Sequence, residues 1–167
     1  MLLNVGSGQR PFPKPWINVD INPRWNPDIV ADGATMNLPS DSADVIVLHH
    51  TLEHYGCGEA DMLVRNCHRI LKPGGSLLVF VPDMRALVHM WLKGKIDAQL
   101  FMTNAYGAYH GHEADRHRWG YDQGLLLKFL NECSRWYWSG LFDWKKDRAP
   151  GADLVRAEWI LGVEAIK

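Results

Sequence analysis

The sequence predicts an α/β fold, a mostly parallel sheet with helices on both faces. Short and nearly continuous apolar runs recur along the chain, the clearest at residues 2–5, 45–48 and 77–81. Such runs are typical of strands that are buried on both faces. Between the last two runs, apolar residues from 59 to 71 recur at helical spacing and indicate a helix with one buried face. Strands that alternate with helices in this way indicate parallel strands joined by crossovers.

The beginning of the chain predicts a strand, a glycine loop and a crossover without a helix. The first apolar run, residues 2–5, is followed directly by Gly6-Ser7-Gly8. Prolines at positions 11, 13 and 15 then exclude a regular helix before the next strand at 16–20. We therefore expect a loop or a stub as the first crossover.

The later elements follow from apolar spacing and from residues that stop helices. The helix at 59–71 ends at Lys72-Pro73-Gly74-Gly75, because the residue before a proline avoids the helical region. Asp122 is expected to cap a helix around 125–133. The remaining predicted elements are a short strand at 29–31, a strand at 76–81, a helix from 82 to about 93, and closing strands at 136–144 and 158–166.

Composition limits the partners. The chain has 18 Lys and Arg against 19 Asp and Glu, a formal net charge of -1, so no broad positive field attracts nucleic acid. The longest apolar run is far shorter than the roughly 20 residues of a membrane span. Three widely spaced cysteines without a C-x-x-C pair fit a reducing compartment. We expect a cytoplasmic protein with neither a nucleic-acid nor a membrane partner.

Ligands of parallel α/β sheets bind at the carboxyl ends of the strands, where this chain carries glycines and acids. The glycine loop lacks the third glycine of a dinucleotide fingerprint, and the prolines remove the helix that would hold a pyrophosphate. Asp20, at the end of the second strand, can accept hydrogen bonds from both hydroxyls of an adenosine ribose. Asp32-Gly33, after the third strand, can meet the exocyclic amine of an adenine, although Asp32 fits a loop cap equally well on its own.

In this order, the motifs resemble the class I S-adenosylmethionine-dependent methyltransferases, particularly the small methyltransferase type 11 group. The matching pieces are L-N-V-G-S-G, I-N-V-D-I, the segment from Asp32 to Ile46, H-x-L-E-H from His50 to His54, R-I-L-K-P-G-G-S-L, and G-V-E-A-I-K. The chain departs from the family at Asn4 and Arg10, where an acid and a third glycine are common, and at the prolines, where the family has a full helix. It also lacks the family's extra N-terminal helix, so we expect a fold that is shortened at its N-terminus.

The resemblance implies a Rossmann-like fold and S-adenosylmethionine as cofactor, with S-adenosylhomocysteine as its product. By the same resemblance, Gly6 and Gly8 contact the amino-acid part of the cofactor, Asp20 the ribose and Asp32 the adenine. The full predicted cofactor set is Gly6, Ser7, Gly8, Asp20, Ile21, Asp32, Gly33 and His49.

At 167 residues the chain is expected to form a single methyltransferase-like domain, residues 1–167. We expect a cofactor half at about 1–83, a substrate or lid region at about 84–135 and closing strands at about 136–167.

Methyl transfer is an in-line displacement, so the protein mainly aligns the reacting atoms and supplies a base where the acceptor loses a proton. The predicted catalytic residues are His50, Glu53 and His54, which follow the fourth strand. Histidine suits proton acceptance near neutral pH. In the alternative interpretation this segment only turns the chain into the next helix, with Glu53 bonding backbone amides.

The second half of the chain is rich in histidine and tryptophan. His110, His112 and His117, with two acids between them, are interpreted as a polar lid over the substrate; a metal site is the minority alternative, and none is predicted. Six of the eight tryptophans lie beyond residue 90 and are expected in the core or an interface, so a homodimer through this half is a further hypothesis. Trp119 and Tyr121 are the candidates for stacking on a planar or sugar substrate.

The sequence therefore predicts a methyltransferase that acts on a small-molecule or saccharide acceptor. The alternative from another class is a noncatalytic partner subunit that binds S-adenosylmethionine or S-adenosylhomocysteine.

Overall fold

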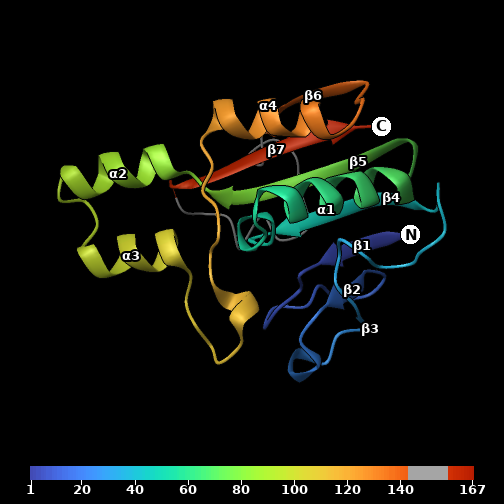
Figure 1. Cartoon of the computed structure of the whole chain (residues 1–167), viewed down its shortest axis with the longest axis horizontal. Helices are drawn as coiled ribbons and strands as arrows, with labels where there is room; N and C mark the ends of the chain where they lie inside the picture. The colour runs from blue at the N-terminus through green and yellow to red at the C-terminus, as the bar shows by residue number, and fades with distance from the viewer. Residues whose placement is uncertain (143–157) are drawn as a thin grey trace.

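The computed structural model describes residues 1–142 and 158–167, and within them seven strands form one sheet (Figure 1). The strand order is β3-β2-β1-β4-β5-β7-β6. β7 runs antiparallel to both of its neighbours, while the other pairs are parallel. The Rossmann-like, mostly parallel sheet is thereby confirmed. The strands are β1 (Leu2–Val5), β2 (Ile17–Asp20), β3 (Ile29–Val30), β4 (Ala43–His49), β5 (Leu71–Pro82), β6 (Trp138–Leu141) and β7 (Ile160–Ile166).

Four α-helices lie in the described chain, and three of them were predicted. These three are α1 (Cys57–Ile70), α2 (Met84–Leu92) and α4 (Gln123–Cys133). The side chain of Asp122 caps α4 by accepting a hydrogen bond from the backbone N–H of Leu125 at 2.8 Å, as expected. The fourth helix, α3 (Ala98–Tyr106), has no buried residue. The sequence therefore has no apolar stripe that would predict this helix. Part of the closing strand expected at 136–144 lies outside the described residues.

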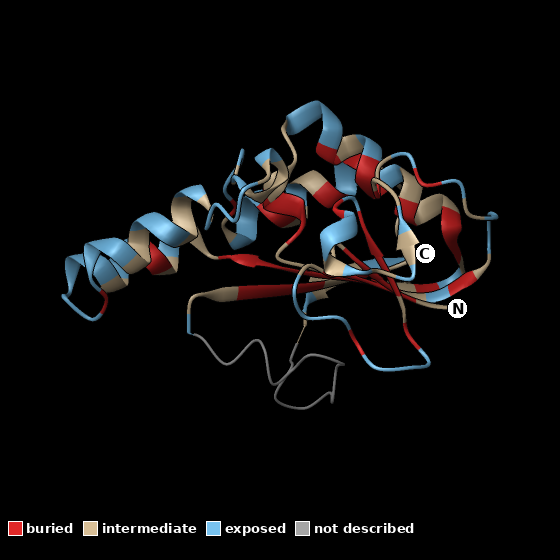
Figure 2. Ribbon diagram, turned by 90° about the horizontal axis from the view of Figure 1, so that it is seen from below, coloured by how far each residue is buried: buried red, intermediate tan, exposed pale blue. Residues whose placement is uncertain are grey.

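The two faces of the sheet are covered differently. α1 and α4 pack on one face, where their apolar stripes meet Ile46 and Leu48 of β4 (Figure 2). On the other face, the intervening Val47 contacts Phe12 and Trp16 from the loop between β1 and β2. The rings of Phe12 and Trp16 meet edge to face at 5.3 Å between centroids. A proline-rich loop thus covers the sheet at the first crossover, which is helix-free as predicted.

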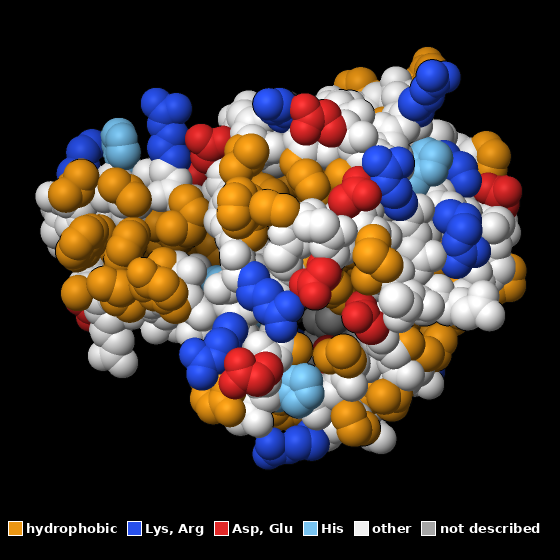
Figure 3. Space-filling model, in the orientation of Figure 1, with side chains coloured by type: hydrophobic (Ala, Val, Ile, Leu, Met, Phe, Trp, Pro, Cys, Tyr) orange, Lys and Arg blue, Asp and Glu red, His pale blue; other side chains and the backbone are white. Residues whose placement is uncertain are grey.

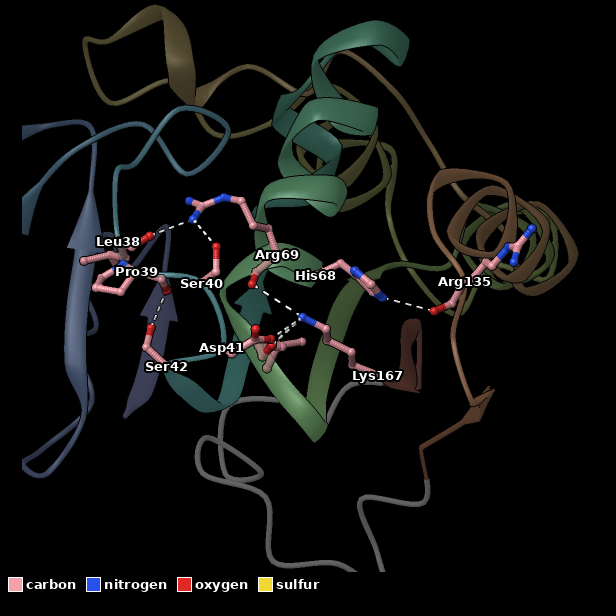
Figure 4. Close-up of polar contacts among 10 residues, drawn as sticks. Leu38, Pro39, Ser40, Asp41, Ser42, His68, Arg69, Arg135 and Lys167 are labelled. Carbon is pink, nitrogen blue, oxygen red and sulfur yellow. Dashed lines mark hydrogen bonds and ion pairs between the residues drawn. The ribbon is translucent and has the colours of Figure 1, made fainter.

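Polar contacts fix the edge of the sheet where β4 and β5 begin and β7 ends, opposite the edge where ligands of such sheets bind (Figure 4). Lys167, after β7, places its Nζ 2.7 Å from Oδ1 of Asp41 and 2.8 Å from the carbonyl oxygen of Leu71. Arg69 donates from Nη1 to the carbonyl oxygen of Leu38 at 2.8 Å. These contacts join the loop before β4, the end of α1 and the last strand.

The two helices α2 and α3 form a hairpin that projects from one end of the sheet (Figure 1, left). Trp91 of α2 stacks on Phe101 of α3 with 4.7 Å between ring centroids. Among the described residues, no helix combines the length and the apolar character that crossing a membrane requires.

Candidate active site

A cavity of about 510 Å³ lies at the carboxyl ends of β1, β2, β3 and β4, where the sequence predicts a ligand. Figure 3 shows charged side chains around a hollow on this side of the molecule. The loop that follows α3 forms the opposite wall, to which His112, Ala114, Asp115 and Arg118 contribute. The other lining residues are Gly6, Gly8, Asp20, Ile21, Asn22, Trp25, Ala31, Asp32, Gly33, Ala34, Thr35, His50, Thr51, His54, Tyr55, Glu59 and Met62.

The glycine loop after β1 is built for close packing rather than for phosphate binding. Gly6 has a φ of +73°, and a Cβ at this position would collide with the side chain of Thr51. The backbone N–H groups of Gly6 and Ser7 both donate to the carbonyl oxygen of Val19, at 2.8 and 3.1 Å. The N–H of Gly8 donates to Asp20 at 2.7 Å. These three amides are therefore already occupied and do not form a cradle for a pyrophosphate.

Asp20 ends β2 with both carboxylate oxygens in use. Oδ2 accepts the bond from Gly8, and Oδ1 accepts one from the backbone N–H of Asn22 at 2.8 Å. The residue is only 7% exposed, yet it lines the cavity. A carboxylate has about four acceptor positions, so Asp20 can hold two loops in place and still accept from a ligand.

Asp32 follows β3 and has one oxygen free of contacts from the described residues. Its Oδ1 accepts hydrogen bonds from the backbone N–H of Ala34 at 2.8 Å and from the hydroxyl of Tyr55 at 2.7 Å. No described residue donates to Oδ2. Burial and the bond to Asp32 raise the pKa of Tyr55. Its hydroxyl therefore stays protonated and keeps donating to Asp32. The free oxygen suits a donor such as an amine.

His50 and Glu53 form a hydrogen-bonded pair beside these acids. Nδ1 of His50 lies 3.0 Å from Oε1 of Glu53, which is 1% exposed. Burial raises the pKa of Glu53, but the bond from His50 and the charges of the nearby histidines outweigh it and lower the pKa overall. Because the ionised carboxylate can only accept, the proton of His50 sits on Nδ1 and Nε2 keeps a lone pair. His50 has a φ of +52°, an uncommon conformation for a non-glycine residue that often marks functional sites.

The loop after α3 reaches the same region. The backbone N–H groups of Arg118 and Trp119 donate to the carbonyl oxygen of Glu53 at 2.8 and 3.1 Å, which fastens the loop to the segment after β4. Arg118 also pairs with Glu59 of α1 at 2.9 Å. His112 accepts from the backbone N–H of Ala114 and begins a short 3-10 helix, η3 (Glu113–Asp115). This loop forms one side of the cavity, and its role as a lid over the substrate stays a prediction.

The comparisons with known proteins agree with this arrangement. Residues 13–79 match the family model described as a methyltransferase domain. The chain also aligns over 99% of its length with solved structures of SAM-dependent methyltransferases, with TM-scores that indicate the same fold. Residues 13–79 are thus similar to a methyltransferase domain, and the whole chain has the fold of SAM-dependent methyltransferases. No sequence among the curated proteins matches the chain.

Three solved structures illustrate how similar this chain is to proteins of known structure. A SAM-dependent methyltransferase from Archaeoglobus fulgidus is 13% identical, with a TM-score of 0.63 and 85% of its own chain covered. One from Methanosarcina mazei is 16% identical, with a TM-score of 0.61 and 91% covered. The 1,6-didemethyltoxoflavin-N1-methyltransferase of Burkholderia thailandensis is 14% identical, with a TM-score of 0.57 and 70% covered, and its structure holds S-adenosylhomocysteine. The alignment covers 99% of this chain in each case. At these identities the likeness concerns the fold.

Most of the residues predicted to bind cofactor line the cavity. They are Gly6, Gly8, Asp20, Ile21, Asp32 and Gly33. Ser7 is buried behind the loop and does not line it. His49 does not line it either, because side chains alternate along β4 and place His49 on the Val47 face, 5.9 Å from Phe80 between ring centroids. Burial and the neighbouring His50 lower the pKa of His49 to about 4, so it is neutral near pH 7.

Of the predicted catalytic residues, His50 and His54 line the cavity, while Glu53 is buried and does not line it. Glu53 bonds the side chain of His50, not backbone amides as the alternative interpretation proposed. The substrate-stacking hypothesis for Tyr121 is wrong, because its side chain is 2% exposed and belongs to the core. Trp119 is 44% exposed but does not line the cavity.

Sequence reasoning missed several residues that line the cavity. Trp25 lies in an irregular loop rich in proline and asparagine, and Tyr55 and Met62 carry no motif of their own. For the opposite wall, the only signal in the sequence was the histidine-rich composition near residue 112, which predicted a loop over the substrate. Loop residues reach a cavity through the path of the backbone, which local sequence patterns do not specify.

Proposed function

We propose that this domain transfers a methyl group from S-adenosylmethionine to a small-molecule acceptor, with saccharides as one acceptor class. The observation that supports this most is the arrangement of three side chains in one cavity. Asp20 and Asp32 offer acceptors suited to an adenosine, and His50 presents an imidazole oriented by Glu53.

The residues present fit the cofactor. S-adenosylmethionine supplies, when bound, an electrophilic methyl group on a positively charged sulfur. Asp20 would accept from the ribose hydroxyls and Oδ2 of Asp32 from the adenine amine, which is the only part of an adenine that donates at such a position. The occupied amides of the glycine loop leave no place for the pyrophosphate of a dinucleotide.

His50 is the proton acceptor in the proposed reaction. A bond forms between an acceptor heteroatom and the methyl carbon while the bond from that carbon to sulfur breaks, and S-adenosylhomocysteine leaves. The proton that the acceptor loses goes to Nε2 of His50, because Nδ1 already donates to Glu53. Glu53 is a positioning residue, since it is buried and acts through His50.

A bounded cavity supports a small acceptor. The volume of about 510 Å³ falls in the usual range for small-molecule pockets, and the loop after α3 forms a wall opposite the glycine loop. One structural neighbour is named for methylation of 1,6-didemethyltoxoflavin, itself a small molecule. We also propose a cytoplasmic location, supported by the three cysteines, all of which are free thiols.

A second candidate is a noncatalytic subunit that binds the cofactor and assembles with a partner chain. A homodimer is the related hypothesis for the same surface. It is favoured by the apolar side chains that gather over the α2 and α3 end of the molecule (Figure 3, left). Exposed apolar residues there are Val88, Trp91, Leu92, Met102 and Tyr106.

Transfer of a labelled methyl group separates the two candidates. We expect the wild-type protein, incubated with labelled S-adenosylmethionine and a panel of small hydroxyl and amine compounds, to label at least one of them. His50→Ala should keep affinity for S-adenosylhomocysteine but slow single-turnover transfer by about 100-fold to 10,000-fold. His89→Ala, on the exposed side of α2, is the control and should react at the wild-type rate.

Two results would change this account. Transfer at the wild-type rate by His50→Ala would remove the proposed proton acceptor. A wild-type protein that binds S-adenosylhomocysteine and labels no compound in the panel would favour the partner subunit.

A further inference from the structure

A second cluster of side chains lies at the edge of the cavity, and none of its members belongs to the predicted cofactor-binding set. Glu53, His54 and His117 bring one carboxylate oxygen and two imidazole nitrogens within 4.8 Å of one another. Nε2 of His117 lies 3.9 Å from Oε1 of Glu53, and the two histidine rings meet edge to face at 4.7 Å. The three residues come from two segments that the backbone bonds of Arg118 and Trp119 already hold together.

Both histidines of this cluster have their outer nitrogen fixed by a backbone carbonyl. Nδ1 of His117 lies 2.8 Å from the oxygen of Asn104, and Nδ1 of His54 lies 3.2 Å from the oxygen of Arg116. A carbonyl oxygen only accepts, so each Nδ1 carries the proton and each neutral ring keeps its lone pair on Nε2. This bond to a carbonyl oxygen is the outer contact that orients histidines in metal sites.

Glu53 lacks a partner for one of its oxygens. Oε1 accepts from His50, while Oε2 is buried and bonds to no described residue. The lone pair of His117 faces this same carboxylate, so two groups that only accept lie opposite each other. A buried carboxylate oxygen without a hydrogen-bond partner costs free energy, and a bound cation would remove that cost.

We propose that Glu53, His54 and His117 bind a divalent transition-metal ion, for which zinc is the suitable probe. Two imidazoles and one carboxylate are the ligands of catalytic zinc sites that keep an open position, and the same set also suits iron(II). Ligand atoms of a tetrahedral zinc site lie about 3.3 Å apart, so small side-chain rotations close this cluster onto an ion. His54 also lines the cavity, so a ligand in the cavity can complete the coordination.

This site is not the one that the spacing of the loop histidines suggests. His112 caps η3 through Nδ1, and the carboxylate of Asp115 accepts from the backbone N–H groups of His110 and His112. Those groups therefore serve the conformation of the loop. His117 alone joins residues after β4 that lie far away in the sequence.

The test is zinc binding by the metal-free full-length protein, measured by competition with a chromogenic chelator and without cofactor. We expect one zinc ion per chain, and at least about a tenfold loss of affinity in each of His117→Ala, His54→Ala and Glu53→Gln. His110→Ala, an exposed histidine of the same loop, is the matched control and should bind zinc as the wild type does. Cobalt(II) should replace zinc and give a visible absorption band typical of nitrogen and oxygen ligands.

Circular dichroism identifies any variant that fails to fold, and the remaining variants decide the result. Absence of zinc binding in the folded wild type would overturn the proposal, as would binding that all three ligand variants retain. Because cofactor is absent from the measurement, zinc binding without methyl transfer would count against the proposed function and leave this site standing.

Discussion

At the scale of single residues, the two acids of the cavity differ in how much of their bonding capacity the protein uses. Asp20 gives one oxygen to Gly8 and the other to Asn22, whereas Asp32 keeps Oδ2 free of protein donors in the described chain. Both positions follow from the sequence, since each acid comes at the end of a strand. Their different partners do not, because the donors lie in loops whose path the sequence pattern leaves open.

We predict that Asp32→Asn and Asp20→Asn separate cofactor binding from stability. Asparagine at 32 keeps an oxygen for Ala34 and Tyr55 but turns an NH₂ group toward the adenine amine, so cofactor affinity should fall more than tenfold with little change in unfolding free energy. Asparagine at 20 must set its NH₂ group against one of two backbone N–H donors. This variant should also lose about 1–3 kcal/mol of stability.

The measurements are calorimetric titration with S-adenosylhomocysteine and unfolding in urea, made on both variants. Equal affinity of Asp32→Asn and wild type would place the adenine elsewhere. Equal stability of the two variants would show that the bonds from Asp20 to the two loops contribute little.

At the scale of elements, burial explains which helices the sequence reveals. α1 has five buried residues at helical spacing, Ala60, Leu63, Val64, Cys67 and Ile70, and its predicted limits lie close to the observed ones. α3 has none, so periodicity could not locate it. The cluster of Glu53, His54 and His117 was equally hidden, because it forms only when two distant loops meet.

We predict that the caps of α4 and α3 differ in their value for global stability. Asp122 caps α4, which buries Leu126 and Leu130, so Asp122→Ala should lower the unfolding free energy by about 0.5–2 kcal/mol. Asp97 makes the same kind of bond to Leu100 at the start of α3. Asp97→Ala should have a smaller global effect, because α3 can fray without exposing the core.

Thermal or urea unfolding of both variants checks this difference, and hydrogen exchange locates the change. A loss from Asp97→Ala that matches the loss from Asp122→Ala would mean that α3 unfolds together with the core.

At the scale of the whole molecule, the sheet follows from the sequence while its covering follows only in part. Apolar runs located the strands, and the resemblance to class I methyltransferases implied the Rossmann-like plan that the strand order confirms. The prolines correctly excluded a helix at the first crossover, but no pattern indicated that Phe12 and Trp16 would fold back to cover that face. Contacts of this kind depend on the path of an irregular loop.

The central claim is that the cavity at the carboxyl ends of the strands binds an adenosyl cofactor of methyl transfer. Thermal unfolding of the purified full-length chain with S-adenosylhomocysteine, and separately with NAD, tests it most directly. At 100 times its dissociation constant, S-adenosylhomocysteine should add about 2.7 kcal/mol of stability through one site. NAD at the same concentration should add none, since the amides of the glycine loop already donate to Val19 and Asp20. Stabilisation by NAD alone, or equal stabilisation by both ligands, would contradict the account.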